Sequence, residues 1–149
     1  MEYVLISTSL VTGVVGGIFL AFSDFIMPGF GKASPEAGRE AMQVINTQVY
    51  RSLFLVMLMG LGPVVFALGV WAVWAGSVIV LAGAALYLFA VLGVTMVGNV
   101  PMNKRLDRGP DAAPYWPQYQ RAWTRLNHLR SLGSVVAAAC FAFGALGLG

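Results

Sequence analysis

Residues 52–74 read SLFLVMLMGLGPVVFALGVWAVW, and after the dipeptide Ala75-Gly76 residues 77–98 read SVIVLAGAALYLFAVLGVTMVG. Neither stretch contains a charged side chain. Each is long enough to cross a bilayer, since a helix needs about 20 apolar residues to span roughly 30 Å of hydrocarbon. A link of two residues leaves room only for a tight turn, so the two helices must be antiparallel neighbours. This part of the chain therefore predicts a membrane-spanning helical hairpin.

Two further segments, residues 3–22 and 131–148, have the same apolar character. Of the 149 residues 58% are hydrophobic and only 10% are charged, whereas about 25% charge is usual in soluble proteins. We expect one all-α domain over residues 1–149, a bundle of four transmembrane helices running up-down-up-down. The first segment lacks the basic start of a signal peptide and is too long for one, so we expect residues 1–27 to stay in the fold.

The positive charge of the chain is confined to two stretches. All nine Lys and Arg residues lie within residues 32–51 and 104–130, which the four-helix topology puts on one side of the membrane. The positive-inside rule makes that side cytoplasmic, with both termini outside, in the plasma (inner) membrane. A basic chain can also indicate nucleic-acid binding, but charge confined to loops beside apolar spans is the ordinary mark of orientation. We expect the lipid bilayer as a partner and no nucleic acid.

The polar loops carry helix signals of their own. Ser34-Pro35-Glu36 offers a cap residue, a proline at the first helical position and an acid in the first turn. No strong breaker follows before Gly60, so we expect the second helix to begin near Pro35 and to project beyond the bilayer. A similar start at Pro117 is expected to feed directly into the last span. The cytoplasmic ends would then enclose a polar vestibule.

Small residues in the first span predict a packing face. Gly13, Gly17, Ala21 and Asp24 recur at i, i+4, i+8 and i+11, a stripe that allows close approach of helices in lipid. We expect this stripe to point Asp24 into the bundle. The same glycines would also suit a homo-oligomer, so the oligomeric state stays open.

Three residues of the last helix share one face. Trp123, Asn127 and Arg130 lie at i, i+4 and i+7, with His128 beside them. An interfacial anchor with a snorkelling cation would explain Trp123 and Arg130. Asn127 favours a functional interpretation, because an amide gains little from anchoring.

The third span ends at residues 95–103 with two asparagines around a proline. We expect Pro101 to break the helix there, freeing backbone carbonyls and leaving Asn99 and Asn103 as hydrogen-bonding groups. A simple helix terminus is the alternative, since Asn and Pro both favour one.

Asp24, Arg51 and Asn46 complete the candidates. A structural salt bridge between Asp24 and Arg51 at the bilayer edge is as good an interpretation as a catalytic role. Asn46 and Arg51 are five residues apart and would not share a face of one regular helix, so at most one would line a pocket.

The sequence does not contain the residue patterns that several common catalytic and binding sites require. One His and one Cys cannot make a typical zinc site, no Gly-rich phosphate loop is present, and no Ser-His-Asp order stands out. Cys140 cannot form an intramolecular disulfide. We predict no cofactor, but leave open a haem on the single histidine or a mixed metal site using Asp24 and His128.

Five pieces in order along the chain carry a family resemblance: FSDFIMP (22–28), AMQVIN (41–46), Arg51 with Phe54, TMVGNVPMN (95–103) and WTRLNHLR (123–130). Together they resemble the anthrone oxygenase-like family of small four-helix membrane proteins, from the first helix to the last.

The resemblance implies oxidation of a polyphenolic anthrone to an anthraquinone by molecular oxygen, without a dedicated organic cofactor. That chemistry needs a base for an activated C–H proton and groups that stabilise a phenolate-like anion. On this hypothesis His128 or Asp24 is the base, and Arg51 and Arg130 stabilise the anion. The predicted substrate-binding residues are Asn46, Asn99, Asn103, Asn127 and Trp123.

Other functions fit the same composition. A non-catalytic quinone- or lipophile-binding accessory subunit would also take a lipophilic aromatic molecule as its partner. A small multidrug exporter is disfavoured, because such a pump needs an acid deep in the membrane and Asp24 lies near the edge.

Overall fold

The computed structural model describes residues 1–108 and 112–148, and every regular element in these ranges is helical. Four helices are long and apolar enough to cross a membrane: Glu2–Lys32, Leu53–Ala75, Val78–Leu106 and Ala112–Ala145. The chain is an integral membrane protein, and the predicted all-α bundle of four transmembrane helices is confirmed.

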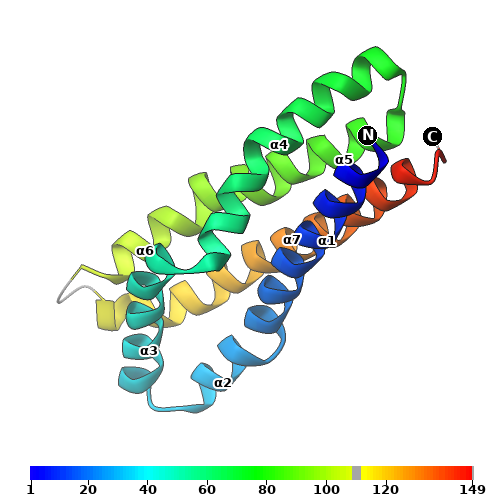
Figure 1. The fold of residues 1–149 in the computed structure, drawn as a ribbon. Helices are drawn as coiled ribbons and strands as arrows, with labels where there is room; N and C mark the ends of the chain where they lie inside the picture. Colours follow the sequence, from blue (N-terminus) through cyan, green and yellow to red (C-terminus); the bar gives the residue numbers. More distant parts are fainter. Residues whose placement is uncertain (109–111, 149) are drawn as a thin grey trace.

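The elements follow one another around a single bundle (Figure 1). The first spanning helix comprises α1 (Glu2–Ala21), the π-helical segment η1 (Phe22–Ile26) and α2 (Met27–Lys32). The helix α3 (Pro35–Gln48) and the 3₁₀ turn η2 (Val49–Arg51) connect it to the second, α4 (Leu53–Ala75). The third comprises α5 (Val78–Ala85), the π-helical segments η3 (Leu86–Gly93) and η4 (Thr95–Asn99), and α6 (Val100–Leu106). The fourth is α7 (Ala112–Ala145).

Helices α1 and α7 lie side by side along most of their length (Figure 1). The buried face of α1 carries Thr8, Thr12 and Gly16, one turn apart. A Cβ at Gly16 would lie 2.9 Å from Cβ of Ser134, so only glycine allows this approach. Small residues therefore bring the two helices together, as is usual in lipid.

The predicted stripe that begins at Gly13 does not face the bundle. Gly13, Gly17 and Asp24 are exposed, and a Cβ on either glycine would meet nothing within 4 Å. The expectation that Asp24 points inward is therefore wrong. The stripe of Thr12 and Gly16 lies one residue, about 100°, around the same helix, and its small side chains are the ones that contact α7.

Helices α4 and α5 form the predicted hairpin. The chain reverses at Gly76, whose φ of 72° is in the left-handed region that favours glycine. Away from the turn, Gly69 packs against Ala84, and the Tyr87 hydroxyl donates to the Leu58 carbonyl oxygen over 2.9 Å.

Helix α3 begins at Pro35 as predicted, with the Ser34 hydroxyl accepting a backbone N–H three residues on. It ends at Gln48 and does not continue into the second span. Ser52 has an extended backbone, and its hydroxyl accepts the Leu55 N–H over 3.2 Å, so it caps a new helix. A capping hydroxyl competes with a continuous helix, which is why the prediction of one long second helix is wrong.

Pro28 and Pro101 both lie inside continuous helices, Glu2–Lys32 and Val78–Leu106. In both cases the N–H of the preceding residue bonds to the carbonyl five residues back, closing a π-helical turn. This shift of the hydrogen-bond ladder accommodates the donor that proline lacks. The first helix therefore extends past Pro28 to Lys32, and the predicted break at Pro101 is wrong. Helix α7 continues directly into the last span as expected, but the predicted start at Pro117 is wrong, because the helix already includes Ala112 and Pro117 lies inside it.

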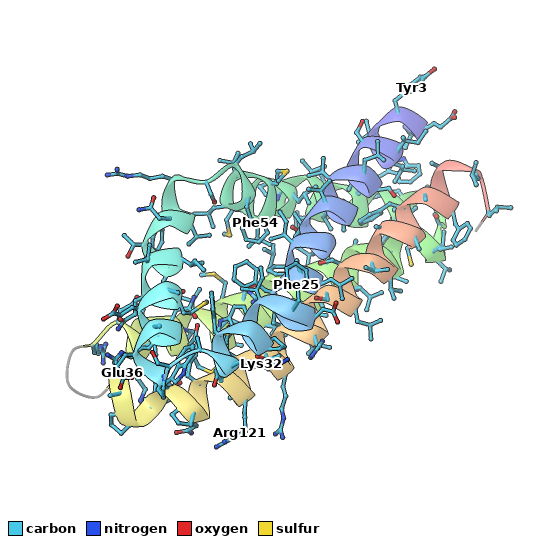
Figure 2. All side chains as sticks on the ribbon, turned by 90° about the horizontal axis from the view of Figure 1, so that it is seen from below. Tyr3, Phe25, Lys32, Glu36, Phe54 and Arg121 are labelled. Carbon is cyan, nitrogen blue, oxygen red and sulfur yellow. The ribbon has the colours of Figure 1, made fainter. Side chains whose placement is uncertain are left out.

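The helix ends beyond the apolar spans form a second packed core, which we call the cap. Its buried residues are Met27, Met42, Leu106, Tyr115, Trp116, Tyr119 and Trp123. Figure 2 shows Lys32, Glu36 and Arg121 at this end of the molecule and Tyr3 at the other. Aromatic side chains therefore fill much of the space where a polar vestibule was expected.

Candidate functional site

A cavity of about 340 Å³ lies where the membrane core meets the cap. Its volume is within the range of about 300–1,000 Å³ that is usual for ligand sites. Rings of Phe19, Phe22, Phe54 and Trp123 line it, and the rings of Phe19 and Phe54 meet edge to face with centroids 5.4 Å apart. Walls of this kind suit a flat, hydrophobic ligand.

One cation, Arg130, is buried in the cavity wall with 5% of its surface exposed. Its guanidinium lies 4.2 Å from the Phe19 ring centroid and 5.2 Å from that of Trp123. One terminal nitrogen donates to Thr95 Oγ1 over 3.3 Å and the other to Asn127 Oδ1, while Nε has no acceptor among the described residues.

The charge of Arg130 is compensated only by neutral groups. Within residues 1–108 and 112–148 its hydrogen-bond partners are a hydroxyl and an amide, and no carboxylate pairs with it. A buried cation without a counter-charge is unfavourable by several kcal/mol, and an ionisable group at membrane depth is a functional candidate by default. The cavity wall is therefore electropositive and complementary to an anion.

Asn127 lies behind this guanidinium instead of lining the cavity. Its Nδ2 donates to the Phe19 carbonyl oxygen over 2.6 Å and to Ser23 Oγ, and its Oδ1 accepts from Arg130. The Phe19 carbonyl oxygen also accepts the Phe22 N–H near the junction of α1 and η1, so Asn127 Nδ2 bonds to its second lone pair. Asn127 thus ties the cation to the first helix.

Polar residues of the third helix line the cavity at intervals of four: Thr95, Asn99, Asn103 and Asp107. Asn99 donates to the Trp123 carbonyl oxygen over 3.4 Å, and its buried Oδ1 has no partner among the described residues. Asn103 Oδ1 accepts from Trp123 Nε1 over 2.9 Å. The unpartnered amide oxygen could accept a hydroxyl group of a ligand.

Asp107 is the only carboxylate among the described residues that line the cavity, and sequence reasoning missed it. It is exposed to solvent at the rim and accepts a hydrogen bond from Asn46 Nδ2 over 3.2 Å. The signal was present, because Asp107 continues the four-residue spacing of Asn99 and Asn103. The expected helix break at Pro101 hid it.

The candidate residues from the sequence fall into separate places. Those that line the cavity are Asn46, Asn99, Asn103, Trp123 and Arg130. Asp24, Arg51 and His128 are exposed and do not line it. His128 instead borders a shallow depression on the outer face of α2 and α7. In the described parts of the chain no ion pair joins Asp24 to Arg51, so the salt bridge considered as an alternative is absent.

The described residues hold no group of three or more His, Cys, Asp or Glu side chains placed to hold a metal ion. What the cavity does offer is an aromatic enclosure, one buried cation, several amides and one carboxylate.

A family model described as anthrone oxygenase matches residues 45–140 of the chain. The matched part includes the polar cavity residues Asn46, Asp107 and Arg130 and excludes Asp24. No curated protein and no solved structure matches the chain.

Proposed function

Because the chain belongs to the anthrone oxygenase family, we propose that it is a membrane-embedded oxygenase that oxidises a polyphenolic anthrone or similar electron-rich aromatic with O₂. The observation that carries this proposal is Arg130, a buried guanidinium without a carboxylate partner among the described residues. A substrate that becomes an anion in the cavity is bound more tightly than its neutral form. Such preferential binding of the charged species lowers the barrier to forming it.

The reaction converts the methylene group of the anthrone to a carbonyl group, and O₂ supplies both the carbonyl oxygen and the oxygen of one water. A base removes one methylene proton, and the electron pair delocalises onto the ring oxygen as a phenolate-like anion. The anion passes one electron to O₂, and the resulting radical and superoxide combine, with a proton, into a hydroperoxide at that carbon. Loss of water across the remaining C–H and the O–O bond gives the quinone.

The cavity suggests a role for each polar residue. Arg130 stabilises the anion, and Asn99 and Asn103 orient phenol oxygens. We assign the base to Asp107, because it is the carboxylate at the cavity while His128 and Asp24 lie outside it. A positioned base typically contributes about 10²–10⁴-fold to the rate.

The placement of the basic residues supports an orientation with the cavity at the cytoplasmic face and both termini outside. In this orientation a lipophilic aromatic that partitions into the bilayer reaches the cavity near the membrane boundary. The reaction as written requires no organic cofactor.

Purified protein supplied with 1,8-dihydroxyanthrone tests the proposal. We expect O₂ uptake and quinone absorbance to rise well above the spontaneous rate, with one O₂ consumed per quinone formed. Heat-inactivated protein is the control, and metal analysis of the same sample shows whether a metal contributes. A rate equal to that of the control would refute an oxygenase acting on this substrate. Quenching of tryptophan fluorescence by an anthraquinone, without turnover, would instead support the lipophile-binding alternative.

A further inference from the structure

We propose that the outer face of α7, beside α2, binds the headgroup of an anionic phospholipid. Arg121, Arg125 and His128 lie on this face at i, i+4 and i+7, and all three are exposed. They border a depression of about 350 Å³ between the two helices, separate from the aromatic cavity. The site thus combines a shallow depression with a concentrated positive charge.

Packing of α2 against α7 builds the floor of this depression. Gln120 Nε2 donates to the Met27 carbonyl oxygen over 3.3 Å, and a Cβ at Gly31 would lie 3.0 Å from the same nitrogen. Among the described residues that line it there is no carboxylate, and the exposed Asp24 is not one of them. An anion therefore meets two arginines without a competing acid.

The same face of α7 becomes apolar one turn beyond His128. Leu132 and Val135 continue the helical spacing and are 63% and 51% exposed, respectively. Since a helix rises 1.5 Å per residue, the change from basic to apolar takes about 6 Å. A phospholipid has the same order of groups, with its phosphate at the arginines and its acyl chain along Leu132.

Charge selects the class of lipid. Basic pockets between transmembrane helices bind anionic headgroups, and each nearby Lys or Arg strengthens the attraction. A zwitterionic lipid carries its own cation and gains less from Arg121 and Arg125. The ligand chemistry is therefore a phosphodiester with net negative charge, presented by a membrane lipid.

Native mass spectrometry of the full chain in neutral detergent tests this site, with phosphatidylglycerol and phosphatidylcholine as probes. We expect phosphatidylglycerol to bind preferentially and R121Q/R125Q to weaken its binding about 10-fold. The control R51Q/R108Q removes the same charge from exposed positions outside the depression and should bind as the unmodified chain does. R121K/R125K, which keeps the charge, should retain most of the preference.

Three results would overturn the proposal. Equal binding of the two lipids would show that charge does not select the ligand. Equal weakening in both glutamine variants would show that net charge acts without a site. Displacement of the lipid by glycerol phosphate at a similar concentration would indicate a site for soluble phosphates.

Discussion

Replacing Arg130 with methionine should separate catalysis from stability. Methionine keeps a long, flexible side chain against Phe19 and Trp123 but removes the charge and its donors. In the wild-type chain the guanidinium lies 4.2 Å from the Phe19 ring centroid with no carboxylate partner among the described residues. The variant therefore loses the group proposed to stabilise the anion, while the fold loses a buried charge.

The two effects have different magnitudes. Removing one preorganised donor to a developing oxyanion typically lowers the rate by about 10²–10³-fold. The variant no longer buries an unpaired cation, and avoiding the desolvation of that cation stabilises the folded state by several kcal/mol. Against this, Asn127 Oδ1 loses its donor, and an unsatisfied buried acceptor costs about 1–3 kcal/mol. We expect the variant to be about as stable as the wild type, or more so, and to lose at least about 99% of its activity.

Oxygen uptake with 1,8-dihydroxyanthrone and thermal unfolding in the same detergent measure both quantities. Arg108→Met is the matched control, since it removes a positive charge from an exposed position at the same end of the molecule. Arg130→Lys keeps a charge but not the planar fork, so it should recover part of the rate. Full activity in Arg130→Met would refute the role of the guanidinium. A large loss of stability with activity retained in the folded fraction would show that Arg130 is structural.

Three further substitutions extend the reasoning. Asn127→Asp gives Arg130 a carboxylate partner, so oxygen uptake per folded protein should fall about 10-fold or more, because a counter-charge competes with the substrate anion; the melting temperature should fall as well, since a carboxylate cannot donate to the Phe19 carbonyl oxygen as Asn127 Nδ2 does. Asp107→Asn removes the proposed base but keeps an oxygen acceptor, so turnover should fall about 10²–10⁴-fold with anthraquinone binding unchanged; an unchanged turnover would exclude it as the base. Gly16→Val would overpack the α1–α7 contact and lower stability by about 1–3 kcal/mol in denaturant titration, whereas Gly17→Val, which meets open space, should be tolerated.

The sequence predicted the spans because a membrane-spanning helix depends on a continuous run of apolar residues, which can be read without knowing the tertiary structure. Apolar length and a short link suffice to predict a hairpin such as α4 and α5, whatever else the chain does. The packing face of α1 was predicted incorrectly because small residues occur on two adjacent faces, at Gly13 and Gly17 and at Thr12 and Gly16. Only the partner helix distinguishes them, and Ser134 is 118 residues further along the chain from Gly16.

The candidate site was predictable where side chains share a helix. Trp123, Asn127 and Arg130 were recognised by their spacing, and the structure places Trp123 and Arg130 in the cavity wall with Asn127 hydrogen-bonded to the cation. His128 and Asp24 were the two candidate bases, but both side chains are exposed and neither lines the cavity. Whether a side chain beside a polar face points inward depends on the rotation of the helix, which the sequence does not give.

Two π-helical turns explain why the sequence mispredicted where the first and third helices end. The π-helical turns before Pro28 and Pro101 let both helices continue past the membrane core into the cap. Had the third helix ended at Pro101, Asn103 and Asp107 would not share a face with Asn99. Substituting either proline alone should therefore leave the cavity intact, whereas inserting one residue directly after Pro101 should rotate the rest of the third helix by about 100° and turn Asn103 and Asp107 away from the cavity.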